Sequence, residues 1–171
     1  REPCLSGPNP DMRAVMSEAS LQETHAPKNR CFGCGPSNES GLRIRSFVDG
    51  EGPDVVCTFQ PAEHHLAFEG VLNGGINGTP PDCPSNPAAR SRLMKAAGDD
   101  VPPCTVTADF HVKLLRPTPM GVPVTLRARP TKVEGKKATI EAELTAGGKV
   151  TATCLGTFVA VGEGHPAFHR W

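Results

Sequence analysis

The run TVTADFHVKLL, residues 105–115, opens a series of segments that have the composition of β-strands. It contains several β-branched and aromatic residues and neither glycine nor proline, which is typical of a strand. Three further runs follow at residues 122–130, 138–145 and 150–161, and turn sequences rich in glycine or proline separate them. The pattern predicts four consecutive antiparallel strands in one curved sheet.

A hairpin is predicted upstream, over residues 41–60. Its first strand precedes the turn sequence DGEG at residues 49–52, and its second strand is VVCTF at residues 55–59. Pro61 ends the second strand, since proline cannot continue a ladder of backbone hydrogen bonds. Residues 61–72 are then expected to form a loop.

The central segment, residues 73–100, is the only part left to cover one face of the sheet. Its residues taken alone favour a helix with Asn86 as N-cap and Pro87 in the first turn, ending near Gly98. Strands that wrap a central helix make an α+β fold.

The length of 171 residues suits a single domain. Residues 1–30 are polar and rich in Pro, Ser and Asn, so we expect a flexible N-terminal arm with a short helix around residues 11–22. Residues 31–171 then form the folded domain.

Composition excludes several partners and sites. Lys plus Arg equals Asp plus Glu at 18 each, and zero net charge argues against binding to nucleic acid or to a membrane surface. The seven cysteines are odd in number and scattered, which is not typical of a disulfide framework. No run is long enough to span a bilayer, and the first residues lack the apolar centre of a signal peptide. We therefore expect a reduced, cytoplasmic protein.

Several short motifs together resemble one known family. They are CFGCGP at residues 31–36, LNGGI at residues 72–76 with Asp82 beyond it, TADF at residues 107–110 and LRPT at residues 115–118. Their order and spacing resemble hot-dog-fold acyl-CoA thioesterases of the phenylacetic-acid-degradation type. The resemblance implies a curved antiparallel sheet wrapped around a central α-helix, and a homodimer or homotetramer. It also implies hydrolysis of an acyl-CoA thioester without a metal or other cofactor.

The resemblance implies roles for individual residues as well. Asp82 would be the general base or nucleophile, and the backbone N–H near Gly75 would stabilise the oxyanion. Asn73 and Thr107 would assist. Seven helical residues make about two turns, so Gly75 and Asp82 are expected to face one cleft. The residues expected to contact the substrate are Gly74, His64, His65 and Arg116. Arg116 is expected to contact the coenzyme A phosphates, as are Arg43 and Lys113.

The stretch TPPDCPSNP, residues 79–87, departs from the family, whose helix is continuous and apolar at this point. Each proline inside a helix costs roughly 3 kcal/mol or more. Two alternatives follow. Either the sheet imposes a long helix on this stretch, or its first half is a loop and the helix begins at Asn86.

Other reactive residues have weaker patterns. Cys31 and Cys34 form a single C-x-x-C pair, whereas a structural zinc site needs four ligands, so we expect a tight turn without metal. A nucleophilic pair of Cys83 with His64 or His65 is less favoured still, because nothing in the spacing lowers the thiol pKa. The alternative to an enzyme is a non-catalytic hot-dog dimer that binds an acyl-CoA or acyl ligand. A metal-binding module built on Cys31 and Cys34 is a weaker third possibility.

Overall fold

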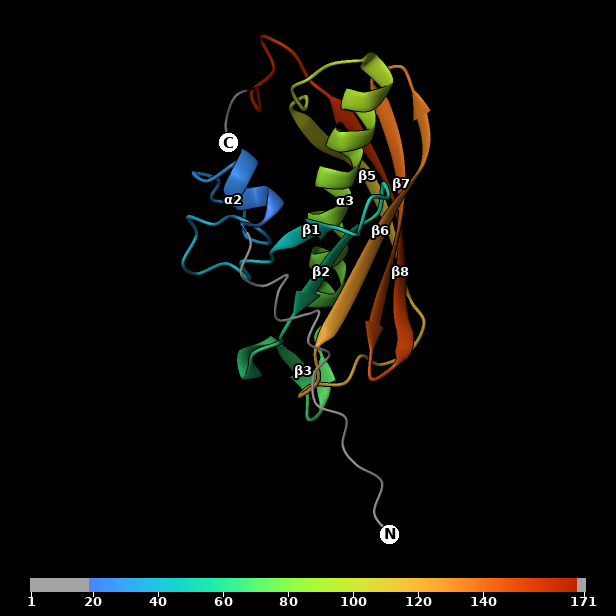
Figure 1. The fold of residues 1–171 in the computed structure, drawn as a ribbon. Helices are drawn as coiled ribbons and strands as arrows, with labels where there is room; N and C mark the ends of the chain where they lie inside the picture. Colours follow the sequence, from blue (N-terminus) through green and yellow to red (C-terminus); the bar gives the residue numbers. More distant parts are fainter. Residues whose placement is uncertain (1–18, 169–171) are drawn as a thin grey trace.

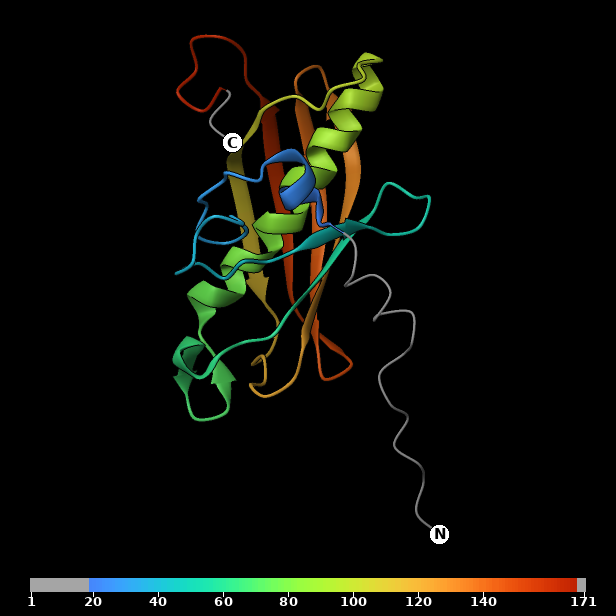
Figure 2. The ribbon, with the colours of Figure 1, turned by 60° about the vertical axis from the view of Figure 1, so that its left-hand side comes forward.

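The computed structural model describes residues 19–168, in which a six-stranded antiparallel sheet curves around one long helix (Figures 1 and 2). The α+β architecture expected from the sequence is confirmed. The strand order across the sheet is β1-β2-β6-β7-β8-β5. These strands are β1 (Ser46–Val48), β2 (Val55–Phe59), β5 (Thr105–Leu114), β6 (Val124–Glu134), β7 (Lys137–Ala146) and β8 (Lys149–Ala160).

The prediction that all four late strands follow one another across the sheet is wrong for the first of them. Strand β5 pairs with β8 at the far edge, and β6 pairs with β2 instead. The connection from β5 to β6 contains Pro117 and Pro119 and does not form a tight hairpin. It runs beside residues 70–72, where the Leu72 N–H donates to the Thr118 carbonyl at 2.9 Å. This crossing leaves β5 as an edge strand.

The expected hairpin is present, but its first strand is shorter than predicted. Strand β1 begins only at Ser46, because residues 42–44 pair instead with the C-x-x-C loop. There the N–H groups of Leu42 and Ile44 donate to the carbonyls of Phe32 and Gly33. The expected loop at residues 61–72 contains the short elements η1 (Glu63–His65), β3 (Leu66–Phe68) and β4 (Val71–Leu72).

Helix α3 (Gly74–Ala97) is continuous, so the helix start at Asn86 that the residues alone favoured is wrong. Asn73 is the N-cap, and Gly98 ends the helix in the left-handed conformation with φ 73°. Glycine is suited to that position because it lacks a Cβ atom. The helix end near Gly98 is confirmed, and the longer of the two alternatives is the one adopted.

Four prolines lie inside α3, at positions 80, 81, 84 and 87. Each removes the N–H that would donate to the carbonyl four residues earlier. Neighbouring side chains bond other carbonyls of the same stretch: the Ser85 hydroxyl donates to Pro81 at 2.6 Å and the Thr79 hydroxyl to Gly75 at 3.2 Å. Pro80 and Pro81 are fully buried, so their rings add apolar contact that offsets part of the cost.

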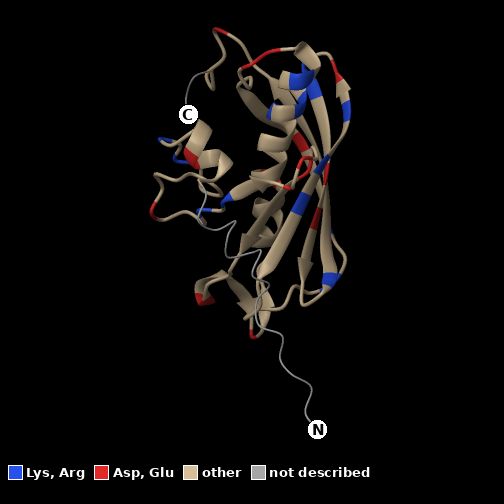
Figure 3. Cartoon of the chain, in the orientation of Figure 1, with Lys and Arg blue, Asp and Glu red and all other residues tan. Residues whose placement is uncertain are grey.

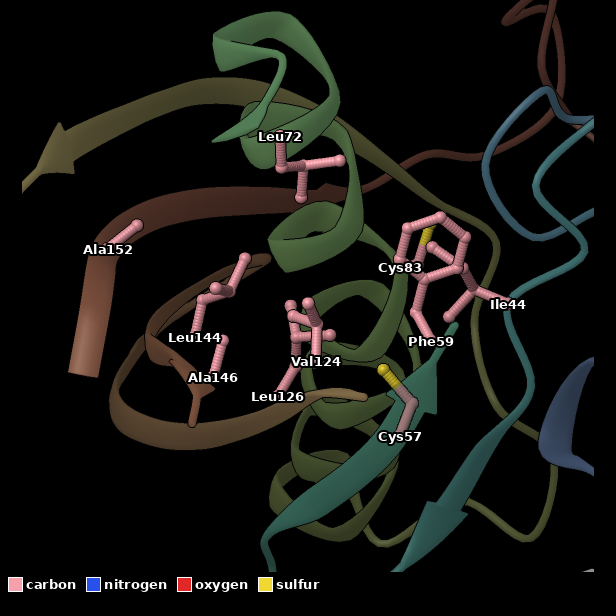
Figure 4. Close-up of a cluster of buried hydrophobic side chains, with 10 residues drawn as sticks. All are labelled: Ile44, Cys57, Phe59, Leu72, Cys83, Val124, Leu126, Leu144, Ala146 and Ala152. Atoms are coloured by element: carbon pink, nitrogen blue, oxygen red, sulfur yellow. The ribbon is translucent and has the colours of Figure 1, made fainter. Parts of the chain in front are cut away.

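The hydrophobic core lies between α3 and the concave face of the sheet. Figure 4 shows its first cluster, which contains Cys83 of α3 and side chains of β2, β6, β7 and β8, with Cys83 beside Phe59. A second cluster contains Ala88, Ala89 and Leu93 of α3. Ala88 and Ala89 have no exposed surface, and such small side chains let the helix approach the sheet closely.

Part of the expected N-terminal arm is packed on the domain. Residues 1–18, and with them most of the helix expected at 11–22, lie outside the described residues. Helix α2 (Leu21–His25) has a capping box made by Ser20 and Glu23. The buried Gln22 amide accepts from the Ser46 backbone N–H and donates to the Ser46 hydroxyl, both at 2.9 Å. The expected flexible arm is therefore wrong for residues 20–26, because these bonds fix them to β1.

Charged residues of both signs are interspersed along the sheet (Figure 3). Arg127 and Arg129 on β6 both pair with Asp54 at the start of β2, and Arg127 also bonds Asp49. Within residues 19–168, no helix combines the length and the apolar character that crossing a membrane requires.

Candidate functional site

Asp82 and Thr107 meet where α3 passes the first half of β5. The Thr107 hydroxyl donates to Asp82 Oδ1 at 2.8 Å. The register of β5 against β8 shifts directly after Thr107, between Thr107 and Asp109, and such a bulge re-aims the neighbouring side chains. Burial raises the pKa of the Asp82 carboxyl above its ordinary value, and the bond from Thr107 opposes that rise. The result is a half-buried carboxylate held in one orientation.

Asp82 and Thr107 open onto a cavity of about 500 Å³. Its walls come from α3, α2, the C-x-x-C loop, the turn before β2 and the beginning of β5. Most of the lining is apolar, with Leu21, Val55, Pro87, Met94 and Val106 among the contributors. A cavity of this size with a few convergent polar groups is typical of a small-molecule site.

A polar stripe runs along α3 beside this cavity and was not predicted. It consists of Asp82, Asn86 and Arg90, which are spaced four residues apart and therefore lie on neighbouring turns of one side. Asn86 exchanges hydrogen bonds with Thr105, accepting from its hydroxyl at 3.0 Å. Arg90 Nε donates to the Pro103 carbonyl at 3.0 Å. The spacing of four is a signal in the sequence, but it is visible only once the helix is known to continue through the prolines.

The Gly-Gly motif lies at the N-terminus of α3, outside the cavity. Asn73 Oδ1 accepts from the N–H groups of Gly75 at 2.8 Å and Ile76 at 3.3 Å. Gly74 and Gly75 are exposed, and neither lines the cavity of Asp82. The expectation that Gly75 and Asp82 share one cleft is therefore wrong within a single chain. Seven residues place them on one side of the helix but about 10 Å apart along its axis.

His64 and His65 lie near the Gly-Gly motif and do not line the cavity of Asp82. The Asn73 N–H donates to the His65 carbonyl at 2.9 Å, which fixes the histidine loop beside the start of α3. His65 Nδ1 accepts from the Ala62 N–H, and its ring packs against Phe59. Burial, with a smaller contribution from His64, lowers the pKa of His65. Neither histidine lines the cavity, so neither pairs with Cys83 as a nucleophile.

The remaining predicted contacts are spread over the surface. Arg116 follows β5, is exposed and does not line the cavity. Lys113 is exposed on β5, and Arg43 lies beside a smaller cavity of about 290 Å³. The structure therefore does not gather Arg116, Lys113 and Arg43 into one phosphate site in the single chain.

Three cysteines gather at the cavity wall. Cys31, Cys34 and Cys83 all line the cavity, and the Cys83 thiol donates to the Thr79 carbonyl at 3.7 Å. The neighbouring Cys34 and burial raise the pKa of Cys31 far above its ordinary value, which keeps that thiol protonated and weakly nucleophilic. Among residues 19–168, no three or more His, Cys, Asp or Glu side chains are grouped to hold a metal ion.

Comparison with known proteins supports one family. A model of the thioesterase superfamily matches residues 88–153. A search of curated proteins by sequence gave no match. Among solved structures, a thioesterase superfamily protein from Shewanella loihica is 25% identical, with a TM-score of 0.61, and the alignment covers 78% of this chain and 96% of that one.

Two further structures have the same fold at lower identity. The PaaI protein of the Escherichia coli phenylacetic acid degradation operon is 18% identical, with a TM-score of 0.60, over 71% of this chain and 81% of its own. A thioesterase from Haemophilus influenzae is 20% identical, with a TM-score of 0.60, over 72% and 84% respectively. The strand order and the wrapped helix are similar to the fold of these structures, and the match over residues 88–153 makes this part of the chain similar to the thioesterase superfamily.

Proposed function

We propose that the protein hydrolyses an acyl-CoA thioester to a carboxylic acid and free coenzyme A. The observation that carries this proposal is the Asp82 carboxylate, which is half-buried at the cavity wall and oriented by Thr107. Its pKa lies above the ordinary value, closer to neutral pH, and this makes it a better base while it remains ionised.

Asp82 supports either of two routes. As a general base it takes a proton from water, whose oxygen attacks the thioester carbonyl. As a nucleophile it attacks the carbonyl itself and forms an anhydride that water then cleaves. In both routes the carbon–sulfur bond breaks and the coenzyme A thiolate takes up a proton. Thr107 acts as a positioning residue, because its hydroxyl holds the carboxylate.

The oxyanion donor comes, on this proposal, from a second copy of the chain. Strand β5 is an edge strand whose residues 108–111 are exposed. Antiparallel pairing of two β5 strands about Phe110 would set Thr107 opposite Lys113 of the second copy. Position 74 lies at that end of β5, since a Cβ atom on Gly74 would come within 3.5 Å of Leu114 Cδ1. Asp82 of one copy would then approach the Gly-Gly motif of the other.

The proposed dimer also explains why the edge strand β5 has exposed apolar side chains. Phe110 and Leu114 are 48% and 56% exposed, and an uncovered apolar edge strand promotes pairing with another chain. A homodimer or a pair of homodimers buries these side chains. On this proposal no metal or other cofactor takes part.

The second candidate is a non-catalytic dimer that binds an acyl ligand. One observation favours it: the Gly75 N–H already donates to Asn73 and is not free to polarise a carbonyl. The two candidates differ in whether Asp82 matters for turnover.

A thiol-release assay over straight-chain and aromatic acyl-CoAs separates them. Asp82→Asn is expected to lower kcat by about 10²–10⁴-fold, the range for a lost acid–base group. Asp99→Asn is the matched control, because Asp99 is exposed beyond the end of α3 and does not line the cavity. Turnover by the parent with equal rates in Asp82→Asn would remove Asp82 from the mechanism, and no turnover at all would favour the binding protein.

A further inference from the structure

Arg90 is a cation built into the wall of the cavity, two helical turns beyond Asp82. Its Nε donates to the Pro103 carbonyl, which fixes the guanidinium plane. A guanidinium has further donors at its two terminal nitrogens, arranged to match the two oxygens of a carboxylate. Among residues 19–168, no carboxylate forms an ion pair with Arg90, although Arg45, Arg127 and Arg129 each have at least one.

Most of the other charged side chains that line the cavity are exposed to solvent. Glu51, Lys95 and Asp100 are exposed, so water and salt screen them. His25 is also exposed. Asp82 and Arg90 alone of the charged lining residues are half-buried, and burial lowers the pKa of Arg90. The cavity therefore contains one partly desolvated carboxylate and one partly desolvated cation, separated by about 12 Å along the helix axis.

We propose that Arg90 binds an anionic group at the far end of the acyl chain, so that the substrate is an acyl-CoA with a second carboxylate. This inference rests on the proposed thioesterase function, since Asp82 marks the position of the thioester carbonyl. Pro87 and Val106 line the same cavity, and their apolar side chains suit a methylene chain or an aromatic ring. Leaving the cation without an anion in the cavity would carry a desolvation cost that the second carboxylate removes.

The geometry sets the length of the acyl group. Asp82 and Arg90 lie about 12 Å apart along the helix axis, and the longer Arg90 side chain leans back towards the N-terminus of the helix and so towards Asp82. The carboxylate and the carbonyl must therefore be several methylene groups apart. Adipoyl-CoA and suberoyl-CoA match this span. Hexanoyl-CoA and octanoyl-CoA have the same chain lengths and end in a methyl group, and they serve as neutral controls for the substrate.

The test compares kcat/KM for these four thioesters in the parent, Arg90→Met and Arg92→Met. Methionine keeps the length and the apolar stem of the side chain and removes the charge. Arg92 is the matched control, because it is exposed on α3 two residues away and does not line the cavity. The parent is expected to prefer adipoyl-CoA or suberoyl-CoA over its neutral control by about tenfold to hundredfold. Arg90→Met should lose that preference while it still hydrolyses the neutral thioesters, and Arg92→Met should behave as the parent.

Two results would overturn the inference: no preference for the dicarboxylic thioesters in the parent, or an equal loss for all four thioesters in Arg90→Met. The second result would mean that Arg90 matters only for its bond to Pro103. If no thioester is hydrolysed, the proposed function fails, and calorimetric binding of free adipate against hexanoate decides the inference by itself. Adipate binding that is lost in Arg90→Met and kept in Arg92→Met supports it, and any other binding result overturns it.

Discussion

The hydrogen bond from Thr107 to Asp82 gives a prediction about the pH dependence of the reaction. Thr107→Val keeps the shape of the side chain and removes the hydroxyl that donates to Asp82 Oδ1 at 2.8 Å. A hydrogen bond to a charged group contributes about 1.5–3 kcal/mol, and one pKa unit corresponds to about 1.4 kcal/mol. The bond stabilises the ionised form, so its loss should raise the pKa of Asp82 by about 1–2 units.

The assay is kcat/KM for one thioester between about pH 5 and 9. The acidic limb of the profile reports the ionisation of Asp82 in the free enzyme and should move to higher pH by the same amount. Thr105→Val is the matched control: it lies on the same strand and loses a hydroxyl that bonds the neutral Asn86. Its limb should stay in place. An unchanged limb in Thr107→Val, with activity retained, would refute the reasoning.

Stability gives a second reading of the same bond. Since the folded pKa of Asp82 is raised, the folded chain binds this proton more tightly than the unfolded chain does. The resulting contribution to stability is fully present below the ordinary pKa of aspartate and is lost as the pH rises through the folded pKa. The bond from Thr107 stabilises the ionised form of Asp82, which predominates at higher pH. The difference in the free energy of unfolding between the parent and Thr107→Val, measured in urea, should therefore be larger at pH 8 than at pH 4.

Two further predictions concern buried groups outside the reaction. The Oδ1 atom of Asn77 is buried without a partner among residues 19–168, and such an atom costs about 1–3 kcal/mol. Asn77→Leu should therefore raise the free energy of unfolding, measured in urea, by about 1 kcal/mol. Asn86→Leu breaks the bonds to Thr105 and should lower it. A loss of stability in Asn77→Leu would contradict this prediction. Burial raises the pKa of Cys57 to about 12 and that of Cys154 to about 11. Both thiols should resist iodoacetamide at pH 8 in the folded chain and react in urea, as peptide mass spectrometry can show, and rapid labelling of the folded chain would contradict the structure.

The sequence alone predicted the strands well, because alternation and turn residues are local signals. Runs 138–145 and 150–161 correspond closely to β7 and β8. The position of β5 was not predictable in the same way. Its pairing with β8 depends on where the connection through Pro117 and Pro119 runs, and that is a contact between distant segments.

The helix shows a different limit. Local propensity correctly counts the four prolines as unfavourable, yet burial of proline rings and the packing of α3 against the sheet outweigh that cost. The resemblance to the thioesterase family implied the continuous central helix that local propensity did not predict. It also indicated Asp82 and Thr107 as site residues, but it gave no indication of Arg90 or Asn86. These two residues became candidates only when the structure placed them on one stripe with Asp82.

The cap at the start of α3 has a consequence for how the proposed oxyanion donor would act. The Gly75 N–H donates to the side chain of Asn73, so an incoming carbonyl has to compete with an amide oxygen and gains little on binding. A tetrahedral intermediate bears a full negative charge on that oxygen and competes far more strongly. The Gly75 N–H would therefore bind the tetrahedral intermediate more strongly than the bound substrate. An interaction of this kind lowers the activation barrier and does not merely tighten substrate binding.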